Sequence, residues 1–318
     1  MPQSVLDEPR FRDERAAYAY VETLVWPSGR VCPHCGVVDR SGPLKGKSTR
    51  TGVYKCYACR KPFTVKVGTI FESSHVPLHI WLQAIHIMCS SKKGFSANQF
   101  ARILGVDIKT GWFIGHRIRE AMMEDGSTGP LGGEGKIVEV DETLYGWIDP
   151  AKKWVDHPYR GRTLDSGSAN RMKIVTLVER GGRARSIKAE DLRADTLRRI
   201  VVENTTDERP AYRHIGDRFA GGHETVNHGE EEWVRGEAHV NTAEGFFVVF
   251  KSGMRGVYQA RSERHLHRYL VEFDFRYNNR VKLGVDDVER SSRAVKGVVA
   301  KRLTYRTTHR EAGEAEAT

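Results

Sequence analysis

Four cysteines offer the clearest metal chemistry in this chain. Cys32 and Cys35 form one C-x-x-C pair, Cys56 and Cys59 form a second, and twenty residues separate the two pairs. This spacing is typical of a zinc ribbon, in which a tetrahedral Zn²⁺ held by four thiolates replaces a large hydrophobic core. The sequence therefore predicts a structural zinc site. A disulfide interpretation is the weaker one, because a cytosolic chain keeps its thiols reduced.

Three acids fall at the ends of different predicted elements in the C-terminal half. Asp141 ends an apolar run whose alternation places Ile137 and Glu139 on the same face of a strand. Asp207 follows a predicted helix and short strand, and Glu244 lies in a predicted amphipathic helix. Carboxylates from separate elements can hold two Mg²⁺ ions ~4 Å apart for phosphoryl transfer. Any one of the 41 acids, taken alone, is more simply a solvated surface charge.

Lys251 lies seven residues after Glu244, about two helical turns, so both side chains project from nearly the same face. A cation in that position would hold a DNA phosphate beside the metals.

Two apolar runs at helical spacing, separated by Gly105, predict a helix-turn-helix shape. Such a motif carries polar and basic side chains of its second helix to the major groove. An ordinary helical hairpin with a solvated basic face is the alternative. The DNA-binding candidates are Lys109, Thr110, His116, Arg117 and Arg119, with Arg276 and Arg280 at the end of a later helix.

The charge balance favours a nucleic-acid partner. Lys and Arg number 51 against 41 Asp and Glu, which gives a net charge of +10 and makes a phosphate backbone the expected ligand. The first twenty residues lack the apolar segment of a signal peptide, and we expect no membrane span. We therefore expect a cytoplasmic protein with no membrane partner.

Several longer motifs occur in the order found in one known family. They are CRKPFTVKVGTIFESSHVPL, SSKKGFSANQFARILGVDIKTGWFIGHRIREAM, VEVDETLYG, HETVNHGEEEWVRGEAHVNTAEGFF and FKSGMRGVYQARSERHLHRYLVEFDFRYNNR. From about Cys32 to Arg280 the chain resembles the ISXO2-like transposases of the IS1595 insertion-sequence family.

This resemblance implies a prokaryotic, nucleoid-associated DDE transposase with an RNase H-like catalytic domain. The first two catalytic acids would be Asp141 and Asp207, and the basic residue would be Lys251. The third ligand falls in HVNTAEG, where the spacing to Lys251 favours Glu244 and Asn241 is the alternative. The resemblance also implies that His239 assists near the scissile phosphate.

The fold expected is a mixed α/β (α+β) multidomain chain. Residues 1–30 would form a helical segment, 31–72 the zinc ribbon and 73–126 the helix-turn-helix-like DNA-binding region. A linker over 127–135 would lead to the RNase H-like domain over 136–290, and 291–318 would be a basic and then acidic, partly disordered tail.

The expected function is transposition with Mg²⁺ or Mn²⁺ as cofactor. The partners would be double-stranded DNA, namely terminal inverted repeats and target, and a second copy of the chain in a dimer or higher oligomer. A degenerate zinc-ribbon DNA-binding regulator and a nuclease without strand transfer are the alternatives. The repeat sequence, target preference, activity of this copy and oligomeric state do not follow from the sequence.

Overall fold

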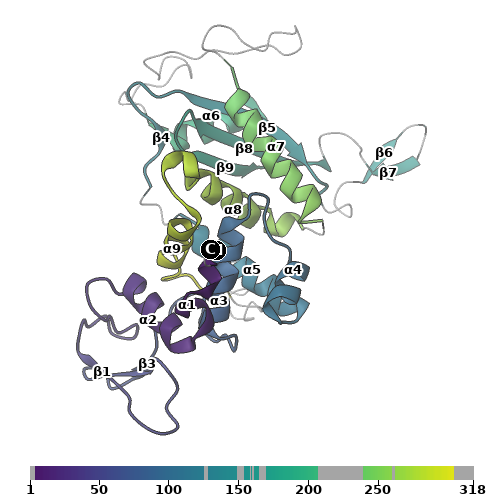
Figure 1. Cartoon of the computed structure of the whole chain (residues 1–318). Coiled ribbons are helices and arrows are strands. Elements are labelled where there is room, and N and C mark those ends of the chain that lie inside the picture. The colour runs from purple at the N-terminus through teal and green to yellow at the C-terminus, as the bar shows by residue number, and fades with distance from the viewer. Residues whose placement is uncertain are drawn as a thin grey trace, which may run out of the picture. The chain divides into compact units, whose positions relative to one another are not determined.

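The chain forms two compact units, shown in a computed structural model (Figure 1). Unit 1 contains residues 1–123 and 287–318, and unit 2 contains residues 124–286. The described residues are 4–124, 128–148, 154–157, 159, 161–164, 170–206, 239–259 and 262–303.

Unit 1 is a helical cluster that carries a small three-stranded sheet. Its helices are η1 (Val5–Asp7), α1 (Pro9–Arg12), α2 (Glu14–Val25), α3 (Leu78–Ser90), α4 (Ala97–Leu104), α5 (Ile108–Met122) and α9 (Asp287–Lys296). The sheet has the order β1 (Ser41–Pro43), β2 (Tyr54–Cys56) and β3 (Pro62–Phe63), with antiparallel pairing.

Helix α3 is the centre of unit 1 because most of its apolar side chains are buried against other helices. Leu78, Trp81, Ile85 and Met88 are almost fully buried, and α1, α2, α5 and α9 all pack against this helix. The carboxylate of Glu14 accepts hydrogen bonds from the backbone N–H groups of Leu78 and His79, which satisfies donors at the start of α3.

Helices α4 and α5 form the predicted helix-turn-helix shape. Ser96 and Gln99 form a capping box at the start of α4, and Asp107 caps α5 by accepting from the N–H of Thr110. Gly105 between the helices has a φ of 66°, a left-handed conformation that costs glycine little.

Residue 291, where a C-terminal tail was expected to begin, lies inside helix α9, which belongs to unit 1. Ala294, Val295 and Val298 are buried there, and the N–H of Ile70 donates to the carbonyl of Val298. This segment is strongly charged, but it carries an apolar stripe on one side. Helices α3 and α5 cover that stripe, which explains why the segment is folded.

Unit 2 contains a three-stranded antiparallel sheet in the order β5-β8-β9, with helices after it. Its strands are β4 (Leu131–Gly132), β5 (Val138–Tyr145), β6 (Trp154–His157), β7 (Gly161–Leu164), β8 (Met172–Glu179), β9 (Ala184–Ala189) and β10 (Thr205–Thr206). Its helices are α6 (Ala194–Asn204), α7 (Asn241–Gly256), η6 (Glu263–His265), α8 (Leu266–Asn278) and η7 (Val281–Leu283). Helices and strands alternate along this unit, and the mixed fold class is confirmed.

Two hydrophobic clusters lie on opposite faces of this sheet. Ile174 and Val178 of β8 pack with the phenylalanines of α7 and α8, whereas Val175 and Leu177 pack with α6. This division follows from the period of two along a strand, which sends neighbouring side chains to opposite faces. Helices α7 and α8 therefore cover one face and α6 covers the other.

Three details of unit 2 differ from the sequence-based expectations. Strand β5 continues four residues beyond Asp141, because Thr143 and Tyr145 extend its buried alternation. A β6–β7 hairpin lies between β5 and β8, where no strand was predicted from the sequence. Leu131, within the expected linker, belongs to strand β4 and is 1% exposed.

A row of polar side chains crosses the sheet on the α7 and α8 face. Asp141 is paired in register with Thr176, and Thr176 with Ser186. The hydroxyls of Thr176 and Ser186 are 3.0 Å apart, and the N–H and hydroxyl of Ser186 both donate to the carboxylate of Asp274 on α8 at 2.7 Å. Burial raises the pKa of Asp274 to about 7.

This raised pKa gives a pH-dependent stability that the substitution Asp274→Asn should remove. Protonation of Asp274 in the folded state contributes stability that is fully present below pH 3.8 and is lost as the pH rises towards about 7. The free energy of unfolding of the wild type should therefore fall relative to that of Asp274→Asn over this range. Urea titrations at several pH values measure it, and parallel curves for the two proteins would contradict the raised pKa.

Candidate metal centre and catalytic face

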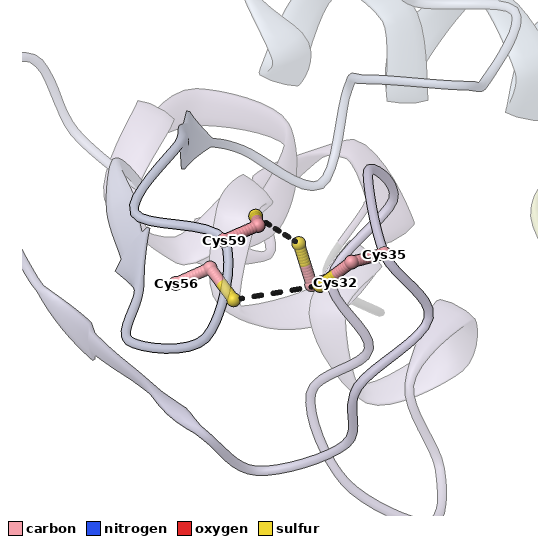
Figure 2. Close-up of side chains that lie close together, drawn as sticks. All are labelled: Cys32, Cys35, Cys56 and Cys59. Carbon is pink, nitrogen blue, oxygen red and sulfur yellow. Dashed lines mark hydrogen bonds between the residues drawn. The ribbon is translucent and has the colours of Figure 1, made fainter.

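The four cysteines converge from two loops of unit 1, as Figure 2 shows. The Sγ atoms of Cys32 and Cys59 are 3.7 Å apart, as are those of Cys35 and Cys56, and all four lie within 4.8 Å of one another. Four thiolates about 2.3 Å from a tetrahedral Zn²⁺ would lie about 3.8 Å apart. The donor set therefore fits a structural Zn²⁺, and the separations are far longer than a disulfide bond.

The apolar support of this centre is small. Phe63 is the large buried side chain beside the cysteines, and Trp26 and Tyr54 pack edge-on or tilted against it at 6.0 Å between ring centroids. Such a core buries too little area to hold the two loops without a further constraint, which is the role that a bound metal plays in ribbons of this size.

Local hydrogen bonding prepares Cys56 for a metal. Backbone N–H groups of Cys59 and Ala58 point at its sulfur and lower the pKa of the Cys56 thiol to about 7, although burial opposes this. A thiolate is the form that binds zinc, so the turn geometry favours the ligand state at Cys56. At Cys35 a backbone bond from Val37 acts in the same direction, but burial and the neighbouring thiols outweigh it and raise the pKa to about 11.

Asp141 lies on the face of β5 that α7 covers. Two residues before it, Glu139 bonds to Thr242 and Ala243 in the first turn of α7. Four residues after it, the ring of Tyr145 packs edge-on against Phe250 of α7 at 5.5 Å. Since alternate residues of a strand share a face, Asp141 faces this helix between the two contacts.

The other described candidates of this site lie on α7 or just before it. Glu244 is in the first turn and half-buried, and Asn241 at the helix start is exposed. Lys251 is half-buried, and its Nζ lies 5.7 Å from the Phe247 ring centroid. Nδ1 of His239 lies 3.4 Å from Glu139 Oε1. Asp207 follows β10 directly and lies outside the described residues.

Glu139, to which the sequence pattern gives no role, is the buried link between β5 and α7. Its side chain is 1% exposed and forms an ion pair with Arg180 at 2.6 Å. A signal was available, because an acid inside an apolar run on the face of Asp141 requires a partner when buried.

The candidate DNA-reading side chains of α5 divide into two groups. Lys109 is exposed and Thr110 half-buried at the start of the helix. His116, Arg117 and Arg119 are at most 5% exposed, so the prediction that they reach the major groove is wrong. The guanidinium of Arg117 donates to the carbonyls of Ile70 and Glu72 at 2.6 and 2.9 Å, and the ring of His116 packs against that of Trp112 at a tilt of 53°.

The two later arginines are also engaged inside unit 2. Arg276 is 8% exposed and pairs with the buried carboxylate of Glu272, which contradicts its assignment to DNA. Arg280 donates to the carbonyls of Gly182 and Tyr277 at 2.9 and 2.7 Å.

Basic side chains missed by sequence reasoning surround the cysteine centre. Between residues 31 and 62 there are seven Lys or Arg and a single acid, Asp39. All seven are exposed, and so is the aromatic ring of Tyr57, at 63%. These exposed cations, which we call the ribbon cations, are Arg40, Lys45, Lys47, Arg50, Lys55, Arg60 and Lys61.

Comparisons with known proteins agree with this organisation. Residues 130–278 match the ISXO2-like transposase domain, and residues 12–62 match the transposase zinc-ribbon domain. The chain is 28% identical over 284 residues to a protein of Halobacterium salinarum described as an uncharacterized protein in transposable element ISH50; the alignment covers 84% of this chain and 91% of that protein. No solved structure matches. Among the described helices, none has the length and apolarity to cross a bilayer.

Zinc should be lost when one thiolate of the centre is removed. In Cys56→Ser we expect the zinc content to fall well below one ion per chain, and trypsin to cut faster at the ribbon cations, because the two loops lose their shared ligand. Metal analysis and timed proteolysis measure this. Cys89→Ser is the matched control, since Cys89 is a buried thiol outside the cluster. Full zinc retention in Cys56→Ser would contradict the assignment.

Two substitutions on α5 should separate stability from DNA binding. Arg117→Ala removes charged hydrogen bonds to buried carbonyls and should lower the free energy of unfolding by about 1.5–3 kcal/mol. Lys109→Ala, at an exposed position, should change it by less than about 0.5 kcal/mol. Denaturant titration measures both. Unchanged stability in Arg117→Ala together with weaker DNA binding would restore Arg117 as a DNA contact.

Proposed function

We propose that this chain, which belongs to the IS1595 family of transposases, cuts DNA at the ends of its insertion sequence and joins the freed 3′-hydroxyls to target DNA. The observation that carries the proposal is the placement of Asp141 on the face of β5 covered by α7, with Glu244 in the first turn of that helix. Both lie within the matched transposase domain.

The proposed catalytic site consists of Asp141, Asp207 and Glu244, with Asn241 as the alternative third ligand. Their oxygens fit Mg²⁺ or Mn²⁺, which would supply electrostatic stabilisation of the attacking and leaving oxygens. Lys251, on the same flank of α7 as Glu244, would hold a DNA phosphate by charge. His239, beside the start of α7, would orient the nucleophile.

Water and then the 3′-hydroxyl act as successive nucleophiles in this scheme, so no covalent protein intermediate is needed. Each step breaks one P–O bond and forms one, with in-line geometry at a single site. Both element ends must be present together for coordinated joining, which requires at least a dimer on DNA.

In this proposal the ribbon cations make most of the contacts to DNA. Seven exposed positive charges against one acid supply the counterion release on which backbone binding depends. Lys109 and Thr110 at the exposed start of α5 are the remaining candidates for groove contact, since recognition helices use their N-terminal residues. The site of action would be the cytoplasmic DNA of a prokaryote.

A strand-transfer assay tests this function. Labelled DNA carrying the ends of the encoding element, plasmid target and Mn²⁺ should give joined product with the wild type. Asp141→Asn should reduce joining by roughly 10²-fold or more, because loss of a metal ligand removes several kcal/mol of transition-state stabilisation. Glu134→Gln, an exposed position in the same unit, is the control expected to keep full activity.

The outcomes distinguish the alternative functions. Nicking without joining would identify a nuclease. DNA binding without any nicking, unchanged in Asp141→Asn, would identify a DNA-binding regulator.

A further inference from the structure

We infer that Glu139 is a positioning residue, which fixes the first turn of α7 on β5 and thereby sets the distance between Asp141 and Glu244. This inference rests on the proposed function, because it assigns to Glu139 the alignment of the proposed metal ligands. Glu139 would act through them and not on the DNA itself.

The contacts of Glu139 form a clamp on the start of α7. Oε2 accepts from the N–H groups of Thr242 at 2.8 Å and Ala243 at 3.0 Å, and Oε1 accepts from the Thr242 hydroxyl at 2.8 Å. Nε of Arg180 donates to Oε1 at 2.6 Å. No side chain of α7 itself caps its N-terminus, so a carboxylate from the neighbouring strand takes that place.

The hydrogen bonds that Glu139 accepts exclude it as a metal ligand in its own right. Burial alone would raise its pKa, but the bonds from Arg180, Ala243 and Thr242 outweigh it and lower the pKa of the carboxyl, so the group that accepts these bonds is a carboxylate. A carboxylate offers about four lone-pair sites, and four donors already occupy them.

The spacing of the clamp relative to the proposed ligands is fixed by the secondary structure. Asp141 is two residues along β5 from Glu139, a rise of roughly 6.6 Å, on the same face. Glu244 is two residues along α7 from Thr242, a rise of about 3 Å. A shift of α7 along the strand would therefore change the separation of Asp141 and Glu244 directly.

Arg180 extends the clamp to the segment that enters α7. Besides its bond to Glu139, its Nη2 donates to the carbonyl of His239 at 3.1 Å, and its backbone N–H donates to the carbonyl of Ile137 next to β5. Strand β5, the end of β8 and the entry of α7 are thus joined at a single carboxylate.

Metal affinity of Glu139→Gln tests the inference. With the zinc-loaded full-length protein, Mn²⁺ binding measured by electron paramagnetic resonance should weaken about tenfold or more, as for other residues that orient metal ligands. The Mn²⁺ concentration for half-maximal nicking should rise by the same factor. Saturating Mn²⁺ should recover much of the nicking rate, which a general loss of folding would not allow.

Ser186→Ala is the matched control for destabilisation. It removes the hydroxyl contact to the buried carboxyl of Asp274 on the same face of the sheet but leaves α7 untouched. If it lowers the melting temperature as much as Glu139→Gln does, it should still bind Mn²⁺ like the wild type.

Three results would overturn the inference. Wild-type Mn²⁺ affinity in a destabilised Glu139→Gln would make Glu139 merely structural. Lost nicking with unchanged Mn²⁺ affinity, not recovered at saturation, would make it a reacting group. A wild-type chain that neither binds Mn²⁺ nor nicks DNA would remove the proposed function as well, which separates that failure from the other two.

Discussion

The buried carboxylate of Glu139 is the interaction on which the candidate catalytic face depends. A helix begins with backbone N–H groups that have no partner within the helix, and at α7 a side chain of the adjacent strand satisfies two of them. The same carboxylate is paired with Arg180, so its charge is compensated where water is excluded. The contact therefore joins the strand of Asp141 to the helix of Glu244 in one arrangement. The packing of Tyr145 against Phe250 adds a second attachment further along the same pair of elements.

Two kinds of metal chemistry follow from two kinds of donor. In unit 1, four thiolates hold a ribbon whose core is too small to fold without a ligand. Much of the ribbon therefore stays exposed to solvent, and its Lys and Arg side chains lie on that surface. In unit 2, the candidate ligands are carboxylates on a sheet and helix that have a substantial core of their own. Soft sulfur ligands suit a permanent structural zinc, whereas hard oxygen ligands suit a cation that must also bind phosphate and exchange water. The proposed DNA binding and the proposed metal chemistry therefore lie in different units of the chain.

Local sequence patterns predicted where the helices and turns lie, but they did not predict which polar side chains are buried. The cysteine spacing, the Ser96 cap and Gly105 are local signals. The features that they predicted, a cluster of four cysteines and a turn between α4 and α5, are confirmed. Burial of His116, Arg117 and Arg119 depends on long-range packing within unit 1; Arg117, for example, bonds to residues 70, 72 and 303. No periodicity in α5 alone could reveal those partners. The need of Glu139 for a partner can be read from its apolar surroundings, but the partners themselves cannot. Arg180 lies more than forty residues away along the chain, and Thr242 and Ala243 lie more than one hundred residues away. The family resemblance of the motifs, in contrast, is confirmed by the matched domains.

The central claim is that Asp141 and Glu244 share a divalent cation, together with Asp207. Anomalous diffraction from crystals of the protein with its DNA ends and Mn²⁺ measures this directly. The account predicts a Mn²⁺ peak bonded to an oxygen of Asp141 and an oxygen of Glu244 or Asn241, at about 2.1–2.2 Å, with Asp207 in the same coordination sphere. A peak bonded to Asp141 without any ligand from α7, or no peak on that face of β5, would contradict it.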